Sequence, residues 1–290
     1  MHNRAYHLAH PARRTTSVVF SSPHSGRDYN RDFLRRILLD EVAVRSSEDA
    51  FVDRLFDVAP QMGAPLIKAG QPRAFIDLNR GPDELDPALI EDVARNGHNP
   101  RVASGLGVIP RVVAGGRAIY AGRIPRSEAE RRIKAFWRPY HRALCTQLDH
   151  AHLMFGQAIL VDCHSMPHEA MESVVRLGAP RPQVVLGDRF GAAADGGIVD
   201  RVEEAFIRAG LLVVRNSPFA GAYVTQTYGR PARGRHAVQI EIDRALYMDE
   251  RTIRPHADFA AFCRLMRGVI AEITAIGRPM AGEAAPLAAE

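Results

Sequence analysis

Short apolar runs rich in β-branched residues alternate with helical segments along most of this chain of 290 residues. The runs that predict strands are 17–21, 66–68, 74–78, 158–161, 184–187, 211–214 and 238–242. The segments whose apolar spacing predicts helices are 48–59, 126–155, 197–209 and 257–276. Strands that alternate with helices over the whole length favour an α/β fold, here a single three-layer α/β/α domain with a mixed, mostly parallel sheet.

We expect this domain to span residues 17–276. Residues 1–16 are polar and predict an N-terminal extension, and residues 277–290, rich in Gly, Pro and Ala, predict a flexible C-terminal tail. Residues 81–125 are rich in Gly and Pro and weakly periodic, with a short hairpin expected around 112–119. A stretch of this kind inside a compact domain is more often a site-forming insertion than a linker.

The predicted helix at 126–155 carries two local signals. Ser127 and Glu130 have the spacing of a capping box at its start. Pro139 lies inside the helix, where a proline removes a backbone hydrogen bond, so we expect a kink at that point.

Basic residues outnumber acidic ones by 38 to 33, which gives a formal net charge of +5. Only Lys68 and Lys134 are lysines, and the arginines are scattered singly or in pairs. A tail or stripe that binds nucleic acid would cluster more strongly. We therefore expect no nucleic-acid partner, and a non-catalytic basic nucleic-acid-binding protein is a remote alternative.

Cysteine usage and hydropathy bear on the compartment. Cys145, Cys163 and Cys263 show no C-x-x-C spacing and cannot all pair within one chain, which favours a reduced, intracellular protein. The first 16 residues lack the apolar segment of a signal peptide, and no run approaches membrane-spanning length. We expect a cytoplasmic protein with no membrane partner, and the sequence leaves its oligomeric state open.

Two predicted strands run into a His-Ser pair, His24-Ser25 and His164-Ser165. Ligands of α/β sheets bind beyond the carboxyl ends of the strands, and a catalytic zinc takes three protein ligands plus water, with imidazole a common one. A shared metal site and two structural histidines are both open at this point. Asp162 lies two residues before His164, on the same strand face, where it could orient the imidazole or bind the metal itself.

The nearest acid after His24 is the pair Glu48-Asp49, at the start of a predicted helix. Either residue could be the third ligand. The alternative is that acids in a first helical turn offset the helix dipole.

Asn79 and Arg80 follow another apolar run, and an Arg at such a position can hold a substrate carboxylate with its two-pronged guanidinium. The alternative is an ordinary turn with a surface arginine. Arg73, a few residues earlier, could face the same cavity and stabilise an oxyanion.

Glu241 interrupts an apolar strand pattern, where an ionised carboxylate is costly unless it is paired or solvated in a cleft. Beside a metal it is the natural general base for activating water. The structural alternative is a partner for Arg244 or Arg235.

The polar motifs occur in a defined order along the chain. They are Pro-His-Ser-Gly at 23–26, Asp-Leu-Asn-Arg at 77–80, Asp-Cys-His-Ser at 162–165, Asn-Ser-Pro-Phe-Ala-Gly at 216–221 and Gln-Ile-Glu-Ile-Asp-Arg-Ala-Leu-Tyr-Met at 239–248. Their joint order and spacing resemble the N-formylglutamate amidohydrolase family over roughly residues 17–275. The resemblance implies an architecture related to zinc carboxypeptidases and aspartoacylase, and one Zn²⁺ per chain or another divalent transition metal.

Carried over by position, the resemblance implies that His24, one acid of the Glu48-Asp49 pair and His164 bind the metal. The family commonly has Thr-Asp at that pair, which aligns Asp49 with the ligand and leaves Glu48 as the alternative. Glu241 then matches the catalytic base.

On the substrate side, the resemblance implies that Asn79 and Arg80 bind a substrate carboxylate. Arg73 matches the arginine that polarises the carbonyl in the relatives. Asn216 and His236 fall in the family's late motifs and are assigned to the substrate pocket.

The implied function is zinc-dependent hydrolysis of the amide of N-formyl-L-glutamate to formate and L-glutamate, a late step of histidine breakdown in the family. Glu241 takes a proton from water, and zinc with Arg73 stabilises the oxyanion. The alternative is an amidohydrolase for another N-acyl amino acid or a short peptide, because paralogues could share the metal residues and differ in the loops of 81–125. In either case the expected partner is a small anionic N-acyl amino acid.

Overall fold

The structure is a computed structural model that describes residues 4–94, 99–172 and 180–279. Its strands are β1 (Tyr6–Ala9), β2 (Val18–Ser22), β3 (Leu66–Ala69), β4 (Ala158–Met166), β5 (Val184–Gly187), β6 (Val213–Arg215), β7 (Arg235–Asp243), β8 (Met248–Asp249) and β9 (Arg254–Pro255). Its α-helices are α1 (Arg31–Arg36), α2 (Glu41–Arg45), α3 (Val52–Leu55), α4 (Pro100–Ala103), α5 (Arg126–Arg132), α6 (Arg138–Phe155), α7 (Gly196–Arg208), α8 (Tyr223–Tyr228) and α9 (Phe259–Ile276).

Within the described residues, the main sheet has seven strands in the order β1-β3-β2-β4-β7-β5-β6. The neighbours β3, β2, β4 and β7 are parallel, while β1 is antiparallel to β3. Strands β5 and β6 are parallel to each other and β5 is antiparallel to β7. The predicted mixed, mostly parallel sheet is confirmed.

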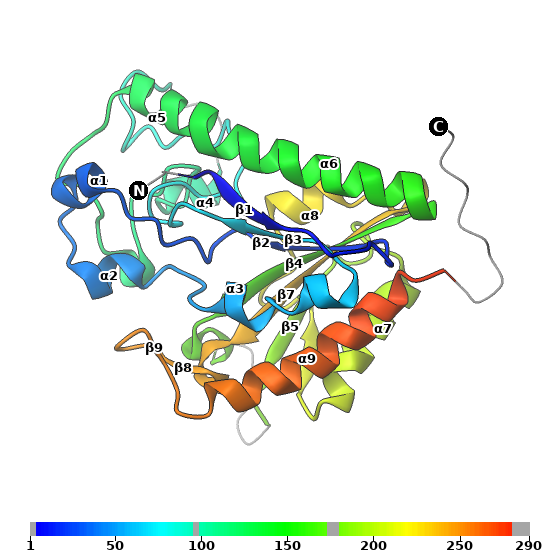
Figure 1. The fold of residues 1–290 in the computed structure, drawn as a ribbon. Helices are drawn as coiled ribbons and strands as arrows, with labels where there is room; N and C mark the ends of the chain where they lie inside the picture. The colour runs from blue at the N-terminus through cyan, green and yellow to red at the C-terminus, as the bar shows by residue number, and fades with distance from the viewer. Residues whose placement is uncertain (1–3, 95–98, 173–179, 280–290) are drawn as a thin grey trace.

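Helices cover both faces of the sheet and make three layers (Figure 1). Helices α6 and α8 lie on one face, and α3, α7 and α9 lie on the other. Strand β2 is buried between these layers. Val18 and Phe20 pack in the core with α7 and α9, whereas Val19 packs in the core with α6. Alternate residues of β2 therefore serve two separate cores, as expected for a strand covered on both faces.

The apolar run 74–78 is a turn, so its prediction as a strand is wrong. Phe75 and Ile76 both donate backbone hydrogen bonds to the carbonyl of Pro72, at 2.9 and 3.2 Å. The side chains of this run are buried because the turn passes through the core. Burial of an apolar run therefore does not distinguish a strand from a turn of this kind.

The helix predicted over 48–59 is also shorter than expected. The regular part is α3, followed by a 3₁₀ turn at Ala59–Met62. Phe51 directly before α3 has a left-handed backbone with φ of 66°, which prevents the helix from reaching back to residue 48. Glu48 and Asp49 therefore lie in the connection between α2 and α3.

Three further predicted segments, two of them at the margins of the domain, have mixed outcomes. Residues Tyr6–Ala9 of the expected extension form the edge strand β1. The hairpin expected around 112–119 is reduced to a single bridge between Val112 and Ala118. Most of the predicted tail, residues 280–290, lies outside the described part of the chain.

The segment 126–155 is helical throughout, as α5, a π-helical turn at Ile133–Trp137 and α6, and runs along one face of the molecule (Figure 1). Helix α5 begins directly after Pro125, so Ser127 lies inside the helix and the predicted capping box is wrong. Pro139 falls in the first turn of α6. The π-helical turn that precedes it is where the regular hydrogen-bond pattern is interrupted.

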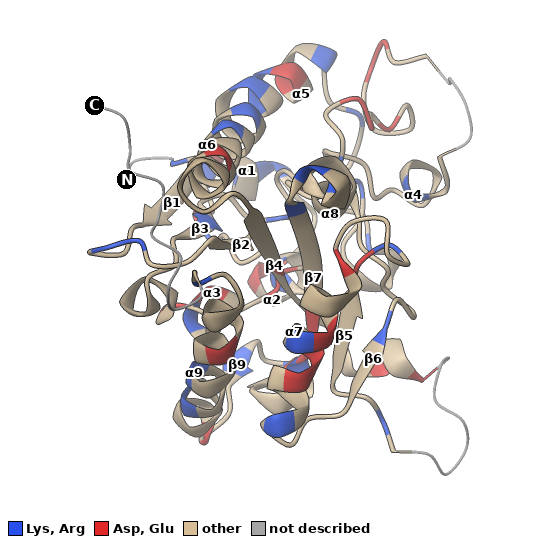
Figure 2. Cartoon of the chain, turned by 90° about the vertical axis from the view of Figure 1, so that its right-hand side faces the viewer, with Lys and Arg blue, Asp and Glu red and all other residues tan. Residues whose placement is uncertain are grey.

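Lys and Arg are spread over helices on both faces of the sheet and are interspersed with Asp and Glu (Figure 2). None of the described helices is long and apolar enough to cross a membrane. Cys145, Cys163 and Cys263 are free thiols.

Candidate active site

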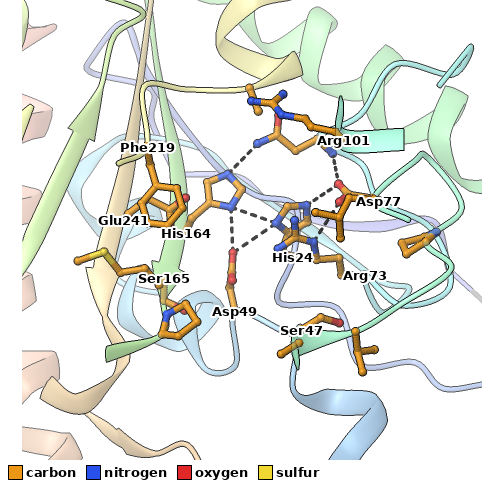
Figure 3. A pocket seen from close by; sticks show the side chains of 18 of the residues that line it. His24, Ser47, Asp49, Arg73, Asp77, Arg101, His164, Ser165, Phe219 and Glu241 are labelled. Carbon is orange, nitrogen blue, oxygen red and sulfur yellow. Dashed lines mark hydrogen bonds and ion pairs between the residues drawn. The ribbon is translucent and has the colours of Figure 1, made fainter. Parts of the chain in front are cut away.

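His24 and His164 meet at the carboxyl edge of the parallel strands. β2 ends at Ser22 and His24 follows in a turn, whereas His164 projects from β4 itself. The two imidazole Nδ1 atoms lie 3.1 Å apart, and both side chains are buried (Figure 3). The topology thus brings together two histidines that are separated by 140 positions in the sequence.

Asp49 completes a cluster of three potential ligand atoms. Its Oδ2 lies 2.9 Å from Nδ1 of His164 and 3.4 Å from Nδ1 of His24. The backbone N–H of Asp49 also donates to the carbonyl of His24 at 3.1 Å, which fixes the loop that carries it. All three side chains are buried, and one ligand atom from each lies within 4.8 Å of the others.

The far nitrogen of each imidazole is held by an aspartate. Nε2–H of His24 donates to Oδ1 of Asp77 at 2.7 Å, and Nε2–H of His164 donates to Oδ2 of Asp162 at 2.9 Å. These bonds leave Nδ1 of both imidazoles directed into the cluster, the arrangement typical of metal-binding histidines. Asp162 thus orients an imidazole and is not itself in the cluster.

The donor set of this cluster suits a divalent transition metal, because two imidazole nitrogens and one carboxylate oxygen in a buried pocket are ligands that zinc favours. Burial alone would raise the pKa of Asp49, but hydrogen bonds from His164 and His24 hold it well below its ordinary value. Burial would lower the pKa of His164, and the charge of Asp162 instead raises it well above its ordinary value. Asp49 accepts these hydrogen bonds from the two histidines, and a metal cation bound here would take the place of the donated protons.

Glu48 points away from the cluster. Its Oε1 accepts a hydrogen bond from the Tyr29 hydroxyl at 2.5 Å and one from Nε of Arg45 at 3.2 Å. Of the two adjacent acids, the structure therefore brings Asp49 to the histidines.

Glu241 lies on β7 directly opposite His164 on β4 and lines the same pocket (Figure 3). Its Oε1 accepts a hydrogen bond from Nε2 of Gln239 at 2.9 Å. Burial is the main cause that raises its pKa from the ordinary 4.5 to about 7. A carboxylate with this pKa can both accept and return a proton near neutral pH.

The alternative partners of Glu241 are engaged elsewhere. Arg244 donates from Nη2 to Oδ1 of Asp49 at 3.1 Å, and Arg235 pairs with Asp149 at 2.7 Å. Arg244 thereby holds the second oxygen of the candidate metal ligand Asp49.

Asn79 lines the same pocket beside His164, and its side chain is fully engaged. Its Oδ1 accepts from the backbone N–H of Val224 at 2.8 Å, and its Nδ2 lies 3.4 Å from Oδ2 of Asp162 and 3.5 Å from Oε1 of Gln239. These contacts join the segment of Asn79 to α8, β4 and β7. Both groups of its amide are therefore occupied before any substrate enters.

Arg73 and Arg80 both line the pocket, which has a volume of about 510 Å³. Arg73 donates from Nε to Oδ2 of Asp77 at 3.0 Å. Arg80 donates to the backbone carbonyls of Leu106 and Asn79 and contacts no carboxylate among the described residues. The structure thus places both predicted arginines beside the cluster.

Asn216 and His236 lie away from the pocket, contrary to their assignment. Asn216 has a φ of 61° and bonds to Asp188 through its Nδ2 at 2.6 Å, so it fixes the loop whose next residues line the pocket. His236 lies near the start of β7 and accepts from the backbone N–H of Asp195. At roughly 3.3 Å per residue, this is about 17 Å along the strand from Glu241.

Asp77 and Gln239 are site residues that sequence reasoning did not single out. Gln239 precedes Glu241 by two positions, so the strand period of two places it on the same face and could have found it. Asp77 lies between two turns and outside any strand, where no period predicts the direction of a side chain.

Two histidines, a carboxylate and a neighbouring candidate base at the carboxyl edge of parallel strands define the class: an α/β protein with a candidate metallohydrolase site. Residues 16–248 match the sequence profile of the N-formylglutamate amidohydrolase family. The chain belongs to this family, whose members are named for the hydrolysis of an amide bond.

Two curated relatives carry the name N-formylglutamate deformylase. The protein from Pseudomonas aeruginosa is 32% identical over 260 residues, which cover 88% of this chain and 90% of the relative. The protein from Pseudomonas putida is 31% identical over 240 residues, which cover 80% and 82%.

Solved structures agree on the fold. The N-formylglutamate amidohydrolase from Ralstonia eutropha JMP134 is 34% identical with a TM-score of 0.87, covering 94% of this chain and 98% of that one. The product of Atu2144 from Agrobacterium tumefaciens shares the fold alone, at 17% identity and a TM-score of 0.65 over 94% and 96%.

Proposed function

We propose that this enzyme hydrolyses the amide of N-formyl-L-glutamate to formate and L-glutamate, with one Zn²⁺ held by His24, Asp49 and His164. The observation that carries the proposal is the convergence of two imidazole Nδ1 atoms and one carboxylate oxygen beside Glu241. Family membership supports the substrate, because both curated relatives and the Ralstonia protein are named for it.

When bound, the metal supplies Lewis-acid chemistry, which makes water acidic enough to react near neutral pH. His24 and His164 would offer Nδ1 as ligands while Asp77 and Asp162 hold their Nε2 protons. Asp49 would offer Oδ2, and its other oxygen remains held by Arg244.

Glu241 carries the proton through the reaction. It takes one proton from the attacking water, whose oxygen forms a bond to the formyl carbon. It then returns that proton to the amide nitrogen as the carbon–nitrogen bond breaks, so the products are formate and the free amino group. Gln239 holds one oxygen of Glu241 and leaves the other available for this transfer.

Two arginines of the pocket act on the substrate. Arg80 would bind a carboxylate of the substrate, because its buried guanidinium contacts only neutral carbonyl groups among the described residues. Arg73 would stabilise the negative charge that develops on the formyl oxygen. It lines the pocket and donates to Asp77, the aspartate that also holds His24.

The assignment of the third ligand is tested with two adjacent variants. Asp49→Ala is expected to lose metal, measured by elemental analysis after gel filtration, and formate release with it. Glu48→Ala is the matched control and is expected to retain metal, because Glu48 contacts Tyr29 and Arg45 instead of the cluster. Metal retained in Asp49→Ala and lost in Glu48→Ala would overturn the assignment.

The substrate is tested with the wild-type enzyme on a panel of N-acyl amino acids and short peptides. Fastest formate release from N-formyl-L-glutamate supports the proposal, whereas a clear preference for another acyl group or a peptide would replace it. A place in histidine degradation belongs to the same proposal and follows from the substrate. A cytoplasmic location is part of the proposal because Cys145, Cys163 and Cys263 are free thiols.

A further inference from the structure

Two arginines of the pocket lack a carboxylate partner among the described residues. Arg80 is only 6% exposed, and its guanidinium donates to the carbonyl oxygens of Leu106 and Asn79, at 2.9 and 2.8 Å. Arg101 on α4 is exposed at the rim of the same pocket (Figure 3). No ion pair joins its side chain to any residue that the structure describes.

The other two arginines of the pocket are different, because each is already paired. Arg73 lies 3.0 Å from Asp77, and Arg244 lies 3.1 Å from Asp49. These two pairs neutralise the acids next to the histidines. The positive charge that remains to attract an anion therefore comes from Arg80 and Arg101.

The carboxylate of Glu84 forms hydrogen bonds with both chain segments that carry these arginines. Oε1 of Glu84 accepts from the backbone N–H of Gly81, next to Arg80, at 2.7 Å. Its Oε2 accepts from Nδ2 of Asn99, the N-cap of α4, at 3.2 Å. Glu84 thus fixes the position of α4 relative to Arg80 and leaves Arg101 without an acidic partner.

Electrostatics at Arg80 agree with this arrangement. Burial is the main cause that lowers its pKa, and the charge of Asp77 opposes that effect. Repulsion from Arg73 and Arg101 lowers the pKa further. Arg80 and Arg101, two like charges without an acidic partner among the described residues, are stabilised when an anion enters between them.

We propose that Arg101 is a specificity-determining residue that binds the side-chain carboxylate of the substrate, while Arg80 binds the α-carboxylate. This inference rests on the proposed function, because it assigns the two carboxylates of an N-formyl dicarboxylic amino acid.

The assignment follows from the shape of that molecule. The α-carboxylate is attached to the carbon that bears the formylated nitrogen, so it stays close to the reacting group and matches the buried Arg80. The side-chain carboxylate lies further along the molecule and matches Arg101 at the rim. Binding both carboxylates selects acidic over neutral N-formyl amino acids.

The test compares kcat/KM for N-formyl-L-glutamate and its neutral amide analogue, N-formyl-L-glutamine. Arg101→Ala is expected to lower kcat/KM for N-formyl-L-glutamate by about 10- to 100-fold, mainly through KM, the range expected for a lost charged hydrogen bond. The same variant leaves kcat/KM for N-formyl-L-glutamine nearly unchanged, and Arg101→Lys restores part of the loss. Arg201→Ala, which removes an exposed arginine on α7, is the control and changes neither substrate.

The outcomes separate the inference from the proposed function. An equal loss for both substrates in Arg101→Ala, or no loss for either, overturns the role of Arg101 and leaves the proposed function standing. A wild-type enzyme that releases formate from neither substrate overturns the proposed function and this inference with it. Because Arg101 is exposed on a short helix, thermal unfolding of the variants is expected to match that of the wild type.

Discussion

His164 on β4 and Glu241 on β7 are paired residues in the parallel register of two neighbouring strands. A parallel pair places the side chains of opposed residues on the same face of the sheet. The candidate metal ligand and the candidate base are therefore positioned by one continuous set of backbone hydrogen bonds in the centre of the sheet. The register fixes His164 relative to Glu241, whereas His24 and Asp49 reach the same centre from a turn and a loop.

Asp77→Asn and Asp162→Asn are each expected to weaken metal binding by about 10- to 100-fold. Each variant removes the negative charge that holds a histidine Nε2 proton and makes Nδ1 a better ligand. Metal affinity is measured by competition with a chelating indicator. Asp32→Asn, on the exposed face of α1, is the control; unchanged affinity in both site variants would show that these aspartates do not support the ligands.

Glu241→Gln is expected to retain the metal and lose about 10²- to 10⁴-fold in kcat, the usual contribution of a general base. Gln keeps the size of the side chain and cannot accept a proton. Formate release and metal content are measured on the same preparation. Undiminished kcat with full metal content contradicts the assignment of Glu241 as base.

The raised pKa of Glu241 predicts how the free energy of unfolding depends on pH in the metal-free enzyme. Its pKa is raised from 4.5 to about 7 in the folded state, so between these values the folded chain holds a proton that the unfolded chain releases. This residue therefore lowers the free energy of unfolding progressively as pH rises from about 4.5 to 7, by about 3 kcal/mol in total.

Glu241→Gln removes this dependence. In chelator-treated protein, the variant is expected to exceed the wild type in free energy of unfolding at pH 8 by about 3 kcal/mol, with a much smaller difference at pH 5. Urea unfolding at the two pH values measures both. The same difference at pH 5 and pH 8 would refute the raised pKa.

Asn79→Ala tests whether this residue supports the site or binds substrate. The variant leaves the buried N–H of Val224 without its acceptor, which is expected to cost about 1–3 kcal/mol of folding free energy. Urea unfolding measures the loss. Unchanged stability together with a higher KM would favour the substrate-binding role predicted from the sequence.

The sequence predicts most of the sheet and part of the site, because both depend on local patterns. Polar residues that follow buried strands mark His24 and His164, and the interrupted apolar pattern of β7 marks Glu241. The choice between Glu48 and Asp49 depends on a backbone hydrogen bond to His24, which no spacing reveals.

The errors have a common physical origin. His236 belongs to the same strand as Glu241 but to its opposite end, so motif membership does not place it in the pocket. Asn216 is a polar residue whose side chain accepts from the backbone N–H groups of Asp188 and Phe190 in another segment. Arg101 is an omission and not an error: the sequence does not single it out, because it lies in the insertion 81–125, where the chain has no period from which its position could be predicted.

The most direct test of the central claim is a metal titration of the wild-type enzyme. Chelator-stripped protein receives increasing Zn²⁺, and formate release from N-formyl-L-glutamate is recorded at each step. The structure predicts no activity without metal and a linear rise that saturates at one Zn²⁺ per chain. Full activity in the stripped protein, or a rise that does not saturate at one equivalent, would contradict a single catalytic metal held by His24, Asp49 and His164.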